Sequence, residues 1–159
     1  GIAQYVNNRF DKQVGTDSYN GGDITIGTGA DAAYADVDAV QAAITFVPEK
    51  TGQYEVVFDF NHITTSTATT EFRSETTFRI TDGTTASFAK FSGGLMPATA
   101  AGSGRISQPV MVRHIFTWTG GVSRTVTLQK FNRTMTAVST NVVGASAATG
   151  EIYMTACKV

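Results

Sequence analysis

The feature that most constrains this chain is an alternation of apolar and polar residues with a period of two. In residues 53–63 the large apolar side chains share one face, namely Tyr54, Val56, Phe58 and Phe60. The same alternation recurs in four later segments, residues 71–81, 107–118, 123–131 and 151–159. Successive side chains of a strand point to opposite faces, so each segment is predicted to be a strand with one face in a core. Helical periodicity is weak throughout, and the best helix candidate, residues 30–43, has no clear cap.

Turn-forming residues separate the predicted strands. Pro48 and Gly52 interrupt the chain before residues 53–63, Asp82-Gly83 follows residues 71–81, and Gly120-Gly121 follows residues 107–118. Such pairs are typical of short hairpins, so neighbouring strands are expected to be antiparallel. A further strand is expected at residues 86–91, whereas residues 21–36, 64–70 and 93–104 are expected to be loops because they are rich in Gly, Ala, Thr or Ser. About eight strands in this arrangement predict an all-β, two-sheet antiparallel jelly-roll sandwich.

The chain length and patterning indicate a single domain. The 159 residues, 42% of them hydrophobic, suffice for one core, and neither an internal repeat nor a linker is visible. Residues 41–159 carry the strand patterns and are predicted to be the jelly roll. Residues 1–40 are weakly patterned, and only Ile24 to Ile26 resembles a strand. We expect this part to be an arm or a first strand with a long loop.

One segment resembles a known family. Residues 46–58, with the sequence FVPEKTGQYEVVF, resemble the strand pair of C1q/TNF-like jelly-roll domains, in which a Pro-to-Gly turn leads into a core strand carrying Tyr and Phe. The later hairpins and the long strand ending at Trp118 follow the order of that family. The resemblance implies a tight homotrimer of the kind found at fibre tips and in virion appendages, binding proteins or glycans. The Thr-rich composition of the chain is similar to that of phage tail-fibre tips and head decoration proteins.

The low content of charged residues limits which partners are expected for this chain. Charged residues make up 16% of the chain, below the usual ~25%. The net charge is −1, and the twelve Lys and Arg residues are spread along the sequence, so nucleic acid is not expected as a partner. No apolar run reaches the length of a membrane span, and membrane insertion is not expected. We expect the chain to associate with itself and with other virion or fibre proteins, at a virion or extracellular surface.

The residues needed for catalysis are sparse. Nucleophilic hydrolysis needs a nucleophile beside a base, and the chain has only two histidines, His62 and His114. His114 shares the alternating face of Val112 and Phe116, which predicts a core or interface position. His62 ends a predicted strand before a Thr-rich loop, which predicts an exposed or rim position. The single cysteine, Cys157, is expected to be a small core residue. The sequence therefore predicts a protein that is not an enzyme and has no cofactor.

Two groups of residues remain as candidates for binding. Asp23, Asp31, Asp36 and Asp38 crowd the N-terminal third, and such oxygen ligands on loops suit calcium, although turn aspartates give the same pattern. Candidates for a subunit interface or a ligand are the aromatic and imidazole groups outside the clearest patterns, Tyr5, Tyr19, Tyr34 and His62. The functional prediction is a trimeric virion or surface-fibre protein acting in assembly, capsid decoration or host attachment. The alternative is a carbohydrate-binding module that recognises surface glycans.

Overall fold

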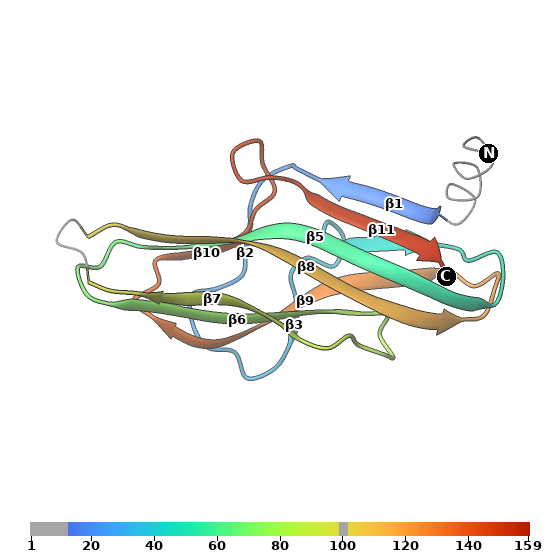
Figure 1. Ribbon diagram of the computed structural model, residues 1–159, viewed down its shortest axis with the longest axis horizontal. Coiled ribbons are helices and arrows are strands. Elements are labelled where there is room, and N and C mark those ends of the chain that lie inside the picture. Colours follow the sequence, from blue (N-terminus) through green and yellow to red (C-terminus); the bar gives the residue numbers. More distant parts are fainter. Residues whose placement is uncertain (1–12, 99–101) are drawn as a thin grey trace, which may run out of the picture.

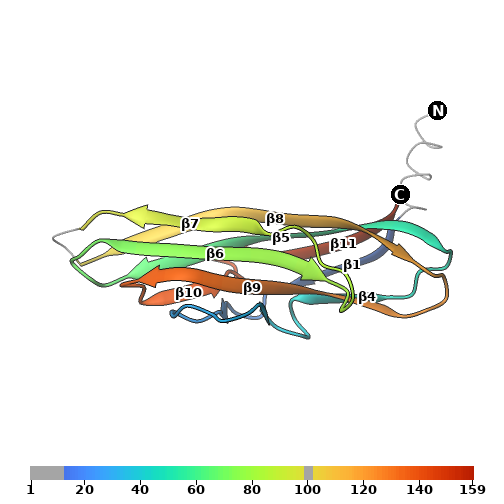
Figure 2. The ribbon, with the colours of Figure 1, turned by 90° about the horizontal axis from the view of Figure 1, so that it is seen from below.

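The computed structural model describes residues 13–98 and 102–159, which form two antiparallel β-sheets packed face to face (Figures 1 and 2). In chain order the strands are β1 (Gln13–Tyr19), β2 (Ile24–Thr25), β3 (Ala35–Asp36), β4 (Ala43–Phe46), β5 (Gly52–Ser66), β6 (Phe72–Thr81), β7 (Lys90–Met96), β8 (Gly104–Trp118), β9 (Arg124–Thr136), β10 (Thr140–Val143) and β11 (Ile152–Lys158). The described residues contain no helix, including none that could cross a membrane. The predicted two-sheet antiparallel jelly roll is confirmed.

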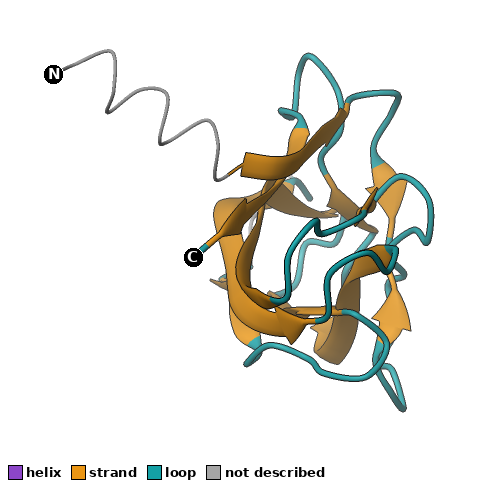
Figure 3. Cartoon of the chain, turned by 90° about the vertical axis from the view of Figure 1, so that its right-hand side faces the viewer, coloured by secondary structure: helices purple, strands orange, loops and turns teal. Residues whose placement is uncertain are grey.

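Each sheet is built around one long central strand. In the first sheet, which we call sheet A, β5 pairs along its whole length with β8 and on its other side with β11 and β10, while β1 and β2 extend the sheet beyond them. In sheet B, β9 pairs with β6 on one side and with β4 and β3 on the other, and β7 pairs with β6. With the strand orders β1-β11-β5-β8 and β4-β9-β6-β7, the chain crosses between the sheets from β4 to β5, β5 to β6, β7 to β8 and β8 to β9. β6 and β7 pair directly within sheet B. Figure 3 shows the two layers end-on.

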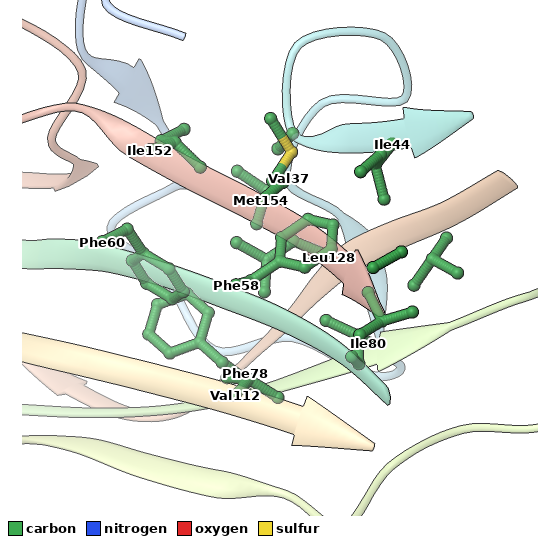
Figure 4. Close-up of a cluster of buried hydrophobic side chains, with 14 of the residues drawn as sticks. Val37, Ile44, Phe58, Phe60, Phe78, Ile80, Val112, Leu128, Ile152 and Met154 are labelled. Atoms are coloured by element: carbon green, nitrogen blue, oxygen red, sulfur yellow. The ribbon is translucent and has the colours of Figure 1, made fainter. Parts of the chain in front are cut away.

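The core lies between the sheets and is filled from the alternating positions. Phe58 of β5, Phe78 of β6 and Leu128 of β9 are fully buried, and their side chains meet between the sheets (Figure 4). Burying such a side chain contributes roughly 1.5–3 kcal/mol. At one end, the Trp118 ring is stacked on Phe116 with their centroids 4.9 Å apart, and its Nε1 donates to Asp82 Oδ2 over 2.8 Å. Partial burial disfavours the Asp82 carboxylate, but donors from Thr85, Trp118 and Thr84 outweigh it and hold its pKa below the ordinary value.

Residues 30–43, the best helix candidate, form no helix: they hold β3, a turn that Asp38 caps through the amide nitrogens of Val40 and Gln41, and the first residue of β4. Two sequence predictions about strands and loops are wrong. The strand expected at residues 86–91 begins instead at Lys90 and continues through Gly93 and Gly94 into the expected loop. Residues 64–66 prolong β5 because all three pair with β8, and Thr64 and Thr65 also pair with β10, a short strand that the patterning did not indicate.

The N-terminal third is partly incorporated into the sheets. β1 pairs with β11, β2 with β10, and β3 with β9, so residues 13–40 contribute strands joined by loops. Ile26 and Val37 are buried in the common core. This arrangement corresponds to a first strand followed by long loops, and residues 1–12 lie outside the described residues.

Candidate interaction surfaces

His62 lies inside the protein, and the prediction of a rim position is wrong. Its side chain is on the same face of β5 as Phe58 and Phe60, and the residue is 2% exposed. The Nε2 atom lies 2.7 Å from Asn141 Oδ1, and Nδ1 lies 2.7 Å from Ser92 Oγ. Because the Asn141 amide donates to Gly27 O, its Oδ1 accepts from the histidine. The alternation with a period of two continues to position 62 and indicates that His62 is buried. The Thr-rich run after it, expected to be a loop, led instead to the prediction of a rim position.

The partners of His62 continue as a buried network between the sheets. Asn141 Nδ2 also donates to Asn132 Oδ1 over 3.2 Å, which accepts from Thr76 Oγ1 over 2.9 Å. On the other side Ser92 reaches Gln108 Oε1 over 3.1 Å. The trio of Ser92, His62 and Asn141 has the composition of a nucleophile, a base and an orienting amide. All three residues are almost completely buried, so no substrate reaches Ser92 in this conformation. The trio is therefore assigned a structural role.

Burial gives His62 a role in pH-dependent stability. Desolvation lowers the pKa of His62 below 6.5 and outweighs the hydrogen bond to Asn141, which acts in the opposite direction. The unfolded chain therefore binds a proton at a higher pH than the folded chain, and stability falls as the pH drops below 6.5. We expect urea unfolding to show this loss, at most about 1.4 kcal/mol per pH unit, as the pH falls below 6.5.

The matched control for this prediction is His62→Gln, which removes the titrating ring. Its free energy of unfolding is expected to be lower overall but flatter across the same pH range. An equally steep pH dependence in wild type and variant would assign the titration to another group and contradict the prediction.

The four aspartates proposed for calcium take part in separate contacts. Asp23 accepts from the amide of Ala145 and from the Thr149 hydroxyl, and these and further donors hold its pKa low although burial acts against them. Asp31 pairs with Lys130 at 2.8 Å, Asp36 accepts from Gln129, and Asp38 caps a turn. Among the described residues no three His, Cys, Asp or Glu gather closely enough to hold a metal ion. Calcium binding stays a prediction from the sequence alone.

The predicted tyrosines have three different outcomes. Tyr5 lies outside the described residues. Tyr19, at the end of β1, packs against the edge of the core. Tyr34 lies at the outer face of sheet B, where its hydroxyl is 3.1 Å from Thr77 Oγ1 and its ring is 5.5 Å from Phe131 between centroids. Of these residues, Tyr34 has the surroundings most like a binding site.

Apolar side chains also occupy the outer face of sheet A, a feature that was not among the sequence predictions. Met111 and Ile115 of β8 and Tyr153 of β11 are 50%, 45% and 54% exposed. The register places Tyr153 and Met111 on either side of Asp59, so they belong to one face across β11, β5 and β8. We call Met111, Ile115 and Tyr153 the β8–β11 face. The signal was that Met111 and Ile115 are apolar although they fall on the otherwise polar face of residues 107–118.

A hollow lies beside this face at the edge of the sandwich. Phe88, Ala89 and Lys90 border it from the segment before and into β7, and Met111, Val112 and Arg113 border it from β8, enclosing about 480 Å³. Phe88 is 95% exposed, although it is one of the largest apolar side chains of the protein. β7 and β8 belong to different sheets but run side by side at this edge (Figure 2). This edge therefore has an exposed apolar side chain, Phe88, next to a cavity.

Comparisons with known proteins give a structural likeness only. No protein-family model matches the sequence, and no curated protein matches it. Among solved structures, the chain is similar to the globular domain of the zebrafish complement 1qA protein, at 11% sequence identity and a TM-score of 0.35. The match covers 93% of this chain and 98% of that chain.

Proposed function

We propose that this protein is a self-assembling structural module that forms a homotrimer on a virion or an extracellular fibre and has no catalytic activity. The observation that supports the proposal most is the β8–β11 face, where Met111, Ile115 and Tyr153 project from the outside of a sheet. The outward face of an antiparallel sheet is usually polar, because it meets water. Large apolar side chains gathered on such a face are typical of a protein–protein interface.

The position of β8 supports the same proposal. β8 spans Gly104–Trp118, and among the described residues its backbone pairs only with β5, so it forms an edge of sheet A. Natural proteins commonly cover, twist or charge long edge strands, since unpaired edges associate with other chains. Here Met111 and Ile115 lie on this edge strand. β7 runs beside part of this edge, and a second copy packed against the outer face of β8 would remove the apolar side chains from water.

The asymmetry of the surfaces supports a ring of copies, and the family resemblance supports three of them. The hollow beside Phe88 lies at one edge, whereas Tyr153 lies on β11, two strands away across β5. Contact between two different patches is heterologous and generates a closed ring when its rotation permits. The resemblance of residues 46–58 to C1q/TNF-like domains implies that the ring closes at three. The low charge of the chain suits packing against further virion or fibre proteins, which we propose as its other partners.

Light scattering coupled to size-exclusion chromatography tests the assembly directly. The full chain at micromolar concentration is expected to elute with three times the mass of its 16.8 kDa protomer. The double variant Met111→Lys/Ile115→Lys is expected to elute as a monomer, because it places two charges in the interface. Val40→Lys is the control, since Val40 is 82% exposed and lies outside the face.

Two results would contradict the proposal. One is a wild-type protein that stays monomeric over the whole concentration range. The other is a double variant that remains as oligomeric as Val40→Lys. Circular dichroism of each variant establishes that loss of the oligomer is not loss of the fold.

A further inference from the structure

A second hollow, of about 580 Å³, lies on the outer face of sheet B, the sheet that does not carry the β8–β11 face. Tyr34 borders it from the segment before β3, Thr77 and Arg79 from β6, and Phe131 and Arg133 from β9. We call this site the β6–β9 hollow. Its volume falls within the range of small-molecule sites, about 300–1,000 Å³. It brings together residues that are far apart in the sequence.

Arg133 lies two residues after Phe131 on β9, so the alternation of the strand places both on the outer face of sheet B. Thr76 pairs with Asn132, but Glu75 pairs with Thr134, so Arg133 is also an extra residue of β9 in this ladder. Such bulges are frequent beside functional sites. Asn132, the residue before the bulge, is buried and holds the strand through its amide bonds to Ile26 and Gly27. The outward position of Arg133 is therefore fixed by the fold.

Arg79 is held in place by neutral and aromatic groups. Its Nε donates to Gln129 Oε1 over 2.9 Å, and Gln129 in turn donates to Asp36. The guanidinium carbon lies 3.9 Å from the centroid of the Tyr34 ring. Stacking on an aromatic ring leaves the edge of a guanidinium open to accept a planar anion. Arg79 is thus oriented before any ligand arrives.

The hollow carries positive charge without a carboxylate partner. Within the described part of the chain, the ion pairs are Arg73 with Glu75 and Lys130 with Asp31. Neither Arg79 nor Arg133 belongs to either pair. Two guanidinium groups at one hollow, in a protein of net charge −1, favour an anionic ligand.

We propose that the β6–β9 hollow binds a carboxylate-bearing sugar residue of an acidic polysaccharide. Arg79 and Arg133 would bind the carboxylate, because a guanidinium matches its two oxygens. Phe131 would pack against the apolar C–H face of the sugar ring, and the Tyr34 and Thr77 hydroxyls lie where they can exchange hydrogen bonds with ring hydroxyls. The inference does not depend on assembly through sheet A.

Titration of the isotopically labelled full chain by NMR tests this site. The probes are oligogalacturonate, its neutral methyl ester, and an oligoglutamate peptide, each added up to about 10 mM. Oligogalacturonate is expected to bind with a dissociation constant in roughly the millimolar range, and its shift changes are expected to cluster on residues 77–79 and 131–133. The neutral ester is expected to bind at least about tenfold more weakly.

Variants distinguish this hollow from general charge attraction. Arg133→Gln is expected to weaken oligogalacturonate binding about tenfold, because Arg133 is exposed and its loss leaves the fold intact. Arg105→Gln, an exposed arginine of sheet A, is the control and is expected to leave the affinity unchanged. Light scattering on both variants keeps a change of oligomeric state separate from a change of binding.

Four outcomes would overturn the proposal. They are no binding of oligogalacturonate, equal binding of its neutral ester, equal binding of oligoglutamate, and equal losses in Arg133→Gln and Arg105→Gln. The third outcome would assign the hollow to acidic protein segments instead of sugars.

Discussion

Replacing Phe78 by alanine is expected to lower the free energy of unfolding by about 3–5 kcal/mol. Phe78 is fully buried at the centre of sheet B and faces sheet A. Its ring meets Phe60 edge-on with the centroids 4.9 Å apart, and it meets His62 in the same manner at 5.2 Å. The substitution therefore removes apolar packing and exposes one side of the buried polar network to a cavity. Both effects act in the same direction.

Urea unfolding at one fixed protein concentration measures this loss, since an assembling protein has a concentration-dependent stability. Phe78→Leu is the graded control and is expected to cost about 1.5 kcal/mol or less, because it keeps most of the apolar volume. Val40→Ala, at an exposed position, is expected to change the stability by less than about 0.5 kcal/mol. Equal losses in Phe78→Ala and Val40→Ala would contradict the central place of Phe78 in the core.

The strands that were predicted well are those in which alternation decides which face is buried. Tyr54 to Phe60 and Phe72 to Ile80 lie in strands as expected, because one apolar face must be covered by the other sheet. A shift by one residue would expose that whole face, so the pattern nearly determines the register. Asp82-Gly83 also lies in a turn as expected, with Asp82 accepting from the amides of Thr84 and Thr85.

The errors occurred where local chemistry and tertiary contacts disagree. His62 precedes a run of Thr and Ser that resembles a loop, yet β10 pairs with that run and prolongs β5. The pairing brings Asn141, a residue far along the chain, onto the imidazole. Local sequence contains no information about such a partner. The β6–β9 hollow was missed for the same reason, since Tyr34, Arg79 and Arg133 meet only after sheet B has formed.

Gly93 shows how a residue typical of loops can be required inside a strand. Residues 93–104 were expected to form a loop because they are rich in Gly and Ala, but Gly93 pairs with Glu75 within the β6–β7 ladder. Its φ of 136° lies in a region that favours glycine. Gln108 of β8 accepts from the Gly93 amide and donates to the Gly93 carbonyl, each over 2.9 Å. These two bonds join the edges of the two sheets.

Replacing Gly93 by alanine is therefore expected to destabilise the protein by about 3 kcal/mol or more, from backbone strain and a steric clash. A Cβ atom at Gly93 would lie 2.0 Å from the Ser74 carbonyl oxygen, a main-chain atom that moves only if β6 and β7 separate. Gly94→Ala is the matched control, because its Cβ would meet only Ile106 Cδ1 at 3.6 Å. Urea unfolding is expected to place the Gly93→Ala midpoint well below that of Gly94→Ala. Equal midpoints would contradict the close backbone approach at Gly93, and with it the reason why a glycine occupies this strand.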